Sequence, residues 1–255
     1  MEAREPGSIN GQEWDEGVFL VDKPEGLTSF AIVRRIRWLL KIKKVGHAGT
    51  LDPFATGLLI VCVGRAATRC IELFMGSKKT YLARLQLGVE TETQDPEGVI
   101  TSIVPVPDLD TATIDACLQQ HVGPQMQAPP YYSAAKLNGK PLYAYAREGV
   151  FIDKAAKPIE IYSLTFKGYD VISNRLDVEV VCSRGTYVRV LAADIGKALG
   201  CGAHLVGLRR TASGPFFVDD CLSGTDLFLE DGLQLLHKGR RSIEEAVRYV
   251  SSPSL

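Results

Sequence analysis

The sequence predicts an α+β fold with a large, mixed and mostly antiparallel sheet flanked by helices. Segments with the two-residue alternation of strands and segments with helical periodicity follow one another in mixed order along the chain. Several strand-like segments are joined by short turns, as between residues 160 and 190, which is typical of hairpins and disfavours a doubly wound parallel sheet. The 255 residues, 45% of them hydrophobic, suffice for a sizeable core.

The first part of the chain predicts two strands with a helix between them. Residues 1–16 are polar and charged, and we expect them to form a flexible tail. GVFLVDKP (17–24) and LLIVCVG (58–64) predict short strands, the second of them buried. Thr28 or Ser29 can cap the intervening helix, whose apolar residues share one face: Ile32, Val33, Ile36, Leu39 and Leu40.

The remaining chain continues the mixed order. KTYLARLQLG (79–88) alternates as a half-buried strand does, and residues 111–122 predict a helix. Residues 123–149 are rich in proline, tyrosine and lysine and predict a long ordered loop followed by a short helix. Residues 161–199 predict strand, turn, strand and helix, and SIEEAVRYV (242–250) predicts a last helix.

Composition limits the function classes. The formal net charge of −1 excludes a global positive field, so an anionic partner must be met by local patches. Six cysteines without CxxC spacing predict free thiols in a reducing compartment. The N-terminus has no apolar core of a signal peptide, and the apolar runs are too short to span a bilayer. We therefore expect a cytoplasmic protein without a membrane partner.

Several chemistries have no motif in this sequence. Phosphate-cradling glycine loops and the GxSxG nucleophile elbow are missing. The four histidines, at 47, 121, 204 and 237, lack HExxH or HxE spacing. An enzyme of this sequence is expected to work with side chains alone, without a cofactor or a metal.

Three local clusters could carry side-chain chemistry. GHAGTLDP (46–53) places Asp52 and His47 among small residues; Asp-Pro is also ordinary turn chemistry, so a purely structural loop is the alternative. Tyr81 lies on the alternating strand, where packing is the alternative to ligand stacking. If CSRGTYVR (182–189) continues as a strand, Tyr187 and Arg189 share a face, and an arginine facing Asp52 would keep that acid ionised.

A run of cations leads directly into the first cluster. A solvated helix face is the plain reading of such a run. Its position before the GHAGTLDP loop instead favours a polyanionic partner. The run consists of Arg34, Arg35, Arg37, Lys41, Lys43 and Lys44.

Five segments, taken in order, resemble the TruB family, the tRNA pseudouridine-55 synthases. They are LVDKPEGLTSF, KKVGHAGTLDPFATGLLIVCVGRAATR, KKTYLARLQLGVETETQDPEG, QAPPYYSAAKLNGKPLYAYAREG and CSRGTYVRVLAADIG. The resemblance covers roughly residues 17–215. It implies a pseudouridine synthase fold with a central RNA-binding cleft, and an isomerase that converts uridine to pseudouridine at position 55 in the T-loop of tRNA.

The resemblance also implies roles for residues at the reacting base. Asp52 is the catalytic nucleophile, attacking either C1′ of the ribose or C6 of the base. Arg189 pairs with it, and Tyr81 stacks on the uracil and serves as a base in a later proton transfer. Tyr187 and Leu208 line the pocket, and Lys23 supports the active-site end of the cleft.

For the RNA, the resemblance implies base flipping, with the His47 ring occupying the space of the flipped nucleotide. Phosphates are then met by the basic run, chiefly Arg34, Arg35, Lys43 and Lys44. A thumb at about 124–150 closes on the T-arm stem-loop, and its backbone contacts fall to Lys136, Lys140 and Arg147.

The expected organisation is a catalytic domain over residues 17–220 and a short helical extension over 221–255, without a complete RNA-binding module of the PUA type. A monomer that binds tRNA fits this architecture. Guide-dependent relatives that modify ribosomal RNA, a non-catalytic tRNA-folding chaperone and a merely structural domain are the alternatives. The TETQDPEG and PPYYSAAK segments favour the stand-alone tRNA type.

Overall fold

The structure, a computed structural model, describes residues 15–251. Most of the expected flexible tail, residues 1–14, therefore lies outside the described residues. Contacts divide the described chain into two units. Unit 1 contains the residues up to Ser77 and those from Arg209 onward, and unit 2 contains Lys78–Leu208. The division into a catalytic domain and a short helical extension stays a prediction.

Unit 1 is built on two long buried strands. β1 (Gly17–Lys23) pairs antiparallel with β3 (Thr56–Val63), which pairs antiparallel with β2 (Val45–Ala48) and parallel with the end of β12 (Ala203–Ser213). Two short strands extend the edges: β13 (Phe216–Phe217) pairs with β12, and β14 (Leu222–Ser223) pairs parallel with β1. Both predicted strands are confirmed.

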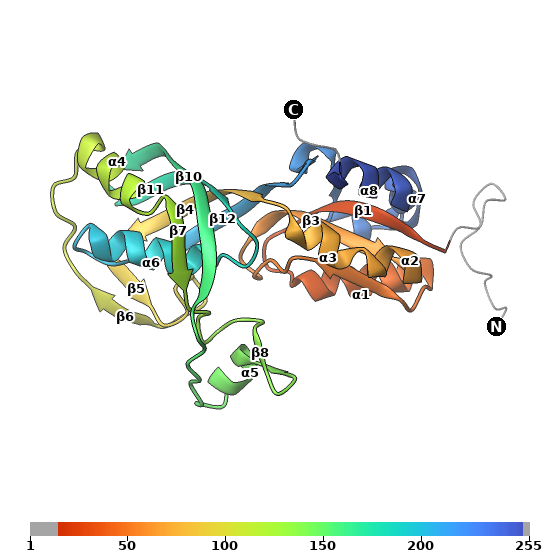
Figure 1. The fold of residues 1–255 in the computed structure, drawn as a ribbon, viewed down its shortest axis with the longest axis horizontal. Coiled ribbons are helices and arrows are strands. Elements are labelled where there is room, and N and C mark those ends of the chain that lie inside the picture. The colour runs from red at the N-terminus through yellow and green to blue at the C-terminus, as the bar shows by residue number, and fades with distance from the viewer. Residues whose placement is uncertain (1–14, 252–255) are drawn as a thin grey trace. The chain divides into compact units, whose positions relative to one another are not determined.

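Helices cover both long strands of unit 1. Alternate residues of β1 and β3, among them Val18, Leu20 and Ile60, pack with Phe74 and Ala246 in one hydrophobic cluster. Figure 1 shows α8 and α7 beside β1, in agreement with their contacts. The helical elements of this unit are α1 (Ser29–Leu40), α2 (Gly64–Arg69), α3 (Ile71–Gly76), η1 (Val218–Asp220), η2 (Asp226–Phe228), α7 (Gly232–Gly239) and α8 (Ile243–Ser251).

Helix α1 follows its sequence prediction closely. The Thr28 hydroxyl oxygen accepts a hydrogen bond from the Ala31 amide at 3.0 Å, so Thr28 is the N-cap. Ile32, Val33, Ile36 and Leu40 are buried, whereas Leu39 is half-buried. The helix ends where Lys41 adopts a left-handed conformation with φ of 55°.

Unit 2 contains an antiparallel series of long strands. β4 (Lys79–Leu87) pairs with β11 (Arg175–Cys182), β11 with β10 (Lys157–Asp170), and β10 with β7 (Gly123–Gln127); β12 follows β4 on the other side. β5 (Val89–Thr91) and β6 (Ile100–Ile103) form a separate hairpin. In β4, Tyr81 and every second residue are buried, as the alternation predicted.

Two helices pack in unit 2, and a smaller segment stands apart from its strands. α4 (Thr111–Gln120) contacts β10 and α6 (Val188–Ala198). The predicted thumb contains the hairpin of β8 (Lys136–Leu137) and β9 (Lys140–Pro141), followed by α5 (Leu142–Ala146), and Figure 1 shows β8 and α5 set off from the sheet of unit 2.

Two expectations were wrong in detail. The predicted loop at 123–149 begins with a true strand, because β7 hydrogen-bonds along β10. Tyr187 and Arg189 do not alternate on a strand: Tyr187 is the extended N-cap of α6 and Arg189 lies in the first turn of that helix. The mixed, mostly antiparallel α+β class is confirmed.

All six cysteines are free thiols, as predicted, and four of them are buried. Between residues 15 and 251, every helix is too short or too polar to cross a membrane.

Candidate active site

Asp52 lies in the loop that joins β2 to β3. Its carbonyl oxygen accepts a hydrogen bond from the Ala55 amide at 3.1 Å, which closes a tight turn over Asp52-Pro53-Phe54-Ala55. Proline at the second position of this turn suits its fixed φ. Phe54 and Ala55 are buried, whereas Asp52 is half-buried. Asp52 is thus partly exposed in this turn, while the two residues that close it are packed.

Lys23 anchors this turn from β1. The side chain is 0% exposed, and its Nζ donates to the carbonyl oxygens of Pro24 (2.8 Å), Leu27 (2.6 Å) and Pro53 (3.1 Å). The Gly26 amide also donates to the Pro53 carbonyl at 2.9 Å. Hydrogen bonds from a buried ammonium are stronger than neutral ones, so the residue after Asp52 is held firmly.

Ser29 anchors the residue before Asp52. Its hydroxyl accepts from the Leu51 amide at 2.9 Å and donates to the Leu51 carbonyl at 3.0 Å, and both residues are buried. The N-terminal end of α1 therefore binds the backbone of the loop directly.

Arg210 supplies a third anchor, from the end of β12. This side chain is 2% exposed; its Nε donates to the Leu58 carbonyl at 2.6 Å and its Nη2 to the Gly49 carbonyl at 3.0 Å. The backbone of Arg210 also approaches Gly57 closely, since a Cβ added there would lie 2.3 Å from the Arg210 carbonyl oxygen. With φ of +101°, position 57 requires glycine on both grounds. Beside it, Arg209 pairs with Asp22 at 2.7 Å.

His47 lies on β2, just before the loop. Burial, and secondarily the charge of Arg210, lower the pKa of its imidazole below the ordinary 6.5, so the ring is neutral at pH 7. Its Nδ1 is buried and has no hydrogen-bond partner among residues 15–251. A neutral flat ring next to the Asp52 loop is suited to contact a base rather than a phosphate.

The predicted site residues of unit 2 are held in place by other residues of the same unit. Arg189 is buried in α6 and its Nη1 pairs with the Asp95 carboxylate at 3.2 Å. The same guanidinium donates to the carbonyls of Thr93 (2.7 Å) and Tyr132 (2.8 Å). Asp95 also accepts from the Glu97 amide at 3.0 Å. The guanidinium plane is thereby fixed by several partners within unit 2.

Tyr187 is fixed by a reciprocal pair of hydrogen bonds. The buried Gln127 side chain accepts from the Tyr187 amide at 2.7 Å and donates to the Tyr187 carbonyl at 3.1 Å. Tyr81 is 8% exposed on β4, paired across from Val180. Leu208, on β12, is half-buried.

The cations predicted to contact RNA form two groups: those that are exposed, and those whose side chains bind other parts of the protein. Arg34, Lys43, Lys44, Lys136 and Arg147 are exposed. The side chains of Arg35 and Lys140 instead bind other parts of the protein.

Arg35 donates to the carbonyls of Leu227 (2.6 Å) and Leu229 (3.3 Å), and so ties α1 to η2. Lys140 forms an ion pair with Glu148 at 2.5 Å, and its ammonium lies 4.4 Å from the Tyr145 ring centroid. These contacts do not use all the hydrogen-bond donors of either side chain, but both side chains stabilise the local structure.

Sequence reasoning missed four supports: Ser29, Arg210, Asp95 and Gln127. For Ser29 the sequence predicts only a role as a helix cap. The other three carry no local signal, because each acts on a residue far away along the chain.

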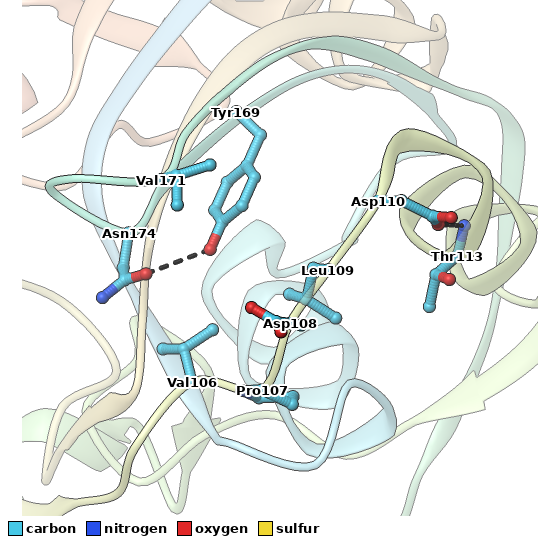
Figure 2. Close-up of a pocket in the computed structure, with 9 residues that line it drawn as sticks. All are labelled: Val106, Pro107, Asp108, Leu109, Asp110, Thr113, Tyr169, Val171 and Asn174. Carbon is cyan, nitrogen blue, oxygen red and sulfur yellow. Dashed lines mark hydrogen bonds between the residues drawn. The ribbon is translucent and has the colours of Figure 1, made fainter.

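Neither a metal site nor the cavity in unit 2 adds to the predicted chemistry. Residues 15–251 hold no group of three or more His, Cys, Asp or Glu side chains that could bind a metal ion. A cavity of about 570 Å³ in unit 2 is drawn in Figure 2. Its Tyr169 hydroxyl donates to Asn174 at 3.0 Å and its Asp110 caps α4. None of the predicted site residues lines it.

Comparisons with known proteins establish the class. Residues 37–188 match the sequence model described as TruB family pseudouridylate synthase (N terminal domain). Residues 189–248 match the one described as tRNA pseudouridylate synthase B C-terminal domain. The chain therefore belongs to the TruB family of pseudouridylate synthases, as its resemblance indicated.

Curated relatives are similar over most of their length. The tRNA pseudouridine synthase B of Desulfotalea psychrophila is 51% identical over 236 residues, which are 91% of this chain and 96% of the relative. The tRNA pseudouridine synthase B of Hydrogenovibrio crunogenus is 41% identical, over 92% of this chain and 84% of the relative.

Solved structures agree with the fold. A chain of a Cbf5-Nop10-Gar1 complex is 28% identical with a TM-score of 0.69, covering 92% of this chain and 62% of its own length. A chain of an H/ACA RNP bound to a substrate RNA containing 2′-deoxyuridine is 27% identical with a TM-score of 0.65, covering 91% and 61%. This chain thus spans about three-fifths of those chains, and the expected pseudouridine synthase fold is confirmed.

Proposed function

We propose that this protein isomerises uridine to pseudouridine in tRNA, at position 55 in the T-loop, with Asp52 as the nucleophile. Membership of the TruB family supports the reaction class. The relatives named tRNA pseudouridine synthase B support tRNA as the substrate, because they match this chain across most of its length.

The observation that carries the proposal is the support of the Asp52 turn. Lys23, Ser29 and Arg210 hold backbone atoms of the loop from three different elements, and all three side chains are buried. A plain Asp-Pro surface turn needs no such anchors. A carboxylate that must meet a reacting carbon within a fraction of an ångström does need them, since a misplacement of about 1 Å can cost about a hundredfold in rate.

The reaction balances with a carboxylate alone. The bond between C1′ and N1 of uridine breaks, a bond between C1′ and C5 forms, and a proton leaves C5 while N1 gains one. Asp52 adds covalently either to C1′, displacing the uracil, or to C6 of the ring, and leaves again when the new bond forms. Oxidation state does not change, so the chain's own side chains suffice.

The remaining site residues take the roles that family membership supports. Arg189 keeps Asp52 ionised, Tyr81 stacks on the uracil and accepts a proton, and Tyr187 and Leu208 line the base pocket. The rigid support of Arg189 by Asp95 and of Tyr187 by Gln127 is consistent with such positioning.

Around the reacting base, His47 contacts the flipped-out region of the loop with its neutral ring. Arg34, Arg35, Lys43 and Lys44 meet phosphates, and Lys136, Lys140 and Arg147 do so from the thumb. Because these contacts are few and local, binding is expected to weaken with salt by a slope of a few ions. A monomer in the cytoplasm completes the proposal.

The test is tritium release from a T-arm stem-loop labelled at uridine C5, because C5 loses its hydrogen only when it becomes the glycosidic carbon. Wild type is expected to release tritium and Asp52→Asn to release none, with little change in unfolding temperature. Asp115→Asn, an exposed acid on α4, is the matched control and should release tritium as wild type does.

Other outcomes separate the alternatives. Release without any guide RNA or partner protein supports the stand-alone type over the guide-dependent relatives. Binding without release by wild type would point to an RNA chaperone. An Asp52→Asn variant that unfolds more easily yet still turns over would show that the turn is only structural.

A further inference from the structure

The outer face of α1 combines exposed aromatic rings with cations. Phe30 is 56% exposed and Trp38 is 68% exposed, while Arg34 between them is exposed as well. These residues are spaced by four, and at about 100° per residue they lie within about 80° of arc on the helix. The buried face, with Ile32 and Ile36, lies on the opposite side.

Both exposed rings lie close to arginine guanidinium groups of the same helix. The Arg35 guanidinium lies 4.5 Å from the Trp38 ring centroid, and the Arg37 guanidinium lies 5.5 Å from that of Phe30. Arg35 is itself fixed by its bond to the Leu227 carbonyl. The guanidinium thus lies over the indole, whose large exposed fraction leaves surface for a second planar partner.

The chain segment that contains this face carries charge of one sign. Residues 26–51 contain six lysines and arginines and no acid, although the whole chain has a net charge of −1. Arg34 is exposed and forms no ion pair with any residue between 15 and 251. Exposed rings interleaved with cations are suited to bind single-stranded RNA, because its planar bases stack on rings and its phosphates pair with cations.

This inference rests on the proposed function: we propose that the face of α1 formed by Phe30, Arg34 and Trp38, together with Lys41 at the C-cap of the helix, is an RNA-binding surface outside the catalytic site. An unpaired base of the RNA stacks on Trp38, and the flanking phosphates meet Arg34 and Lys41. An acidic peptide would satisfy the cations, but the exposed indole favours a base.

Fluorescence of Trp38 tests the stacking directly. The chain has two tryptophans, so Trp14→Phe leaves Trp38 as the reporter. Binding of an unmodified, full-length tRNA transcript should quench its emission saturably, whereas a blunt RNA duplex without unpaired nucleotides should not. No quenching by tRNA, or equal quenching by the duplex, would overturn base stacking. Emission that changes with protein concentration alone would show instead that copies of the chain meet at this face.

Affinity measurements complete the test. Trp38→Ala should weaken tRNA binding about tenfold, and Trp38→Phe should recover most of that loss. Phe217→Ala is the control, because Phe217 is 55% exposed in the same unit but is followed by Asp219 and Asp220 rather than by cations. Unchanged affinity in Trp38→Ala, or equal losses in both variants, would refute the proposal. Neither the fluorescence nor the affinity readout requires turnover, so a failure of tritium release would count against the proposed function only.

Discussion

Ser29→Ala isolates the coupling between α1 and the Asp52 loop. The substitution removes one oxygen atom and leaves the helix otherwise unchanged. It deletes both hydrogen bonds to Leu51, at 2.9 and 3.0 Å, in a buried place that water does not fill easily. The residue set free is the one directly before Asp52.

The magnitude follows from the two backbone groups left behind. An unsatisfied buried donor or acceptor costs about 1–3 kcal/mol, so the two groups together predict a loss of about 2–6 kcal/mol in the free energy of unfolding. We expect a loss of catalytic activity in addition to this loss of stability. A loop loosened by about 1 Å at Asp52 predicts a fall in kcat of about a hundredfold.

Thr28→Ala is the matched control on the neighbouring residue. Its hydroxyl caps α1 through the Ala31 amide, and within residues 15–251 it forms no hydrogen bond to the loop. Losing an exposed cap costs about 1 kcal/mol, and turnover should stay near that of wild type. Urea unfolding and tritium release on both variants measure the two effects.

The comparison has a clear negative result. If Ser29→Ala loses stability but turns over as fast as Thr28→Ala, Ser29 stabilises the fold without positioning Asp52, and the argument from three anchors fails.

Three further predictions concern the same loop. Arg210→Lys should lower the free energy of unfolding by about 2–4 kcal/mol, because two carbonyls lose buried donors, whereas Arg209→Lys at a half-exposed ion pair should cost about 1 kcal/mol or less; urea titrations compare them. Since the pKa of His47 is lowered in the folded state, the unfolded chain binds more protons between that pKa and 6.5, so stability falls as pH drops below 6.5; His47→Gln should flatten this dependence, and an unchanged slope would contradict it. Gly57→Ala should abolish soluble expression because its Cβ meets backbone, whereas Gly26→Ala, with φ of +80° in open space, should cost only about 1 kcal/mol; equal yields would refute the steric argument.

Local elements of the fold were predictable because they depend on neighbours in sequence. The cap at Thr28 and the apolar face of α1 follow from side chains three or four residues apart. The buried alternation of β4 follows from a two-residue period. The Asp-Pro turn likewise needs only its own four residues.

The segment around Tyr187 shows where such reading fails. Three residues do not distinguish a period of 2 from one of 3.6, and Tyr187, Val188 and Arg189 fit either. The side chain of Gln127 distinguishes the two possibilities. It binds both the amide and the carbonyl of Tyr187, and α6 begins directly after that residue. Leu191 and Ile195 are then buried on the helix face.

By itself, the sequence determined the class of fold, the family and the identity of the candidate nucleophile. Only the tertiary structure decided how Asp52 is held. Ser29 reaches Leu51 across 22 residues, and Arg210 reaches Gly49 across 161. No periodicity in the chain encodes such pairs, because each is created when β1, α1 and β12 pack around one loop.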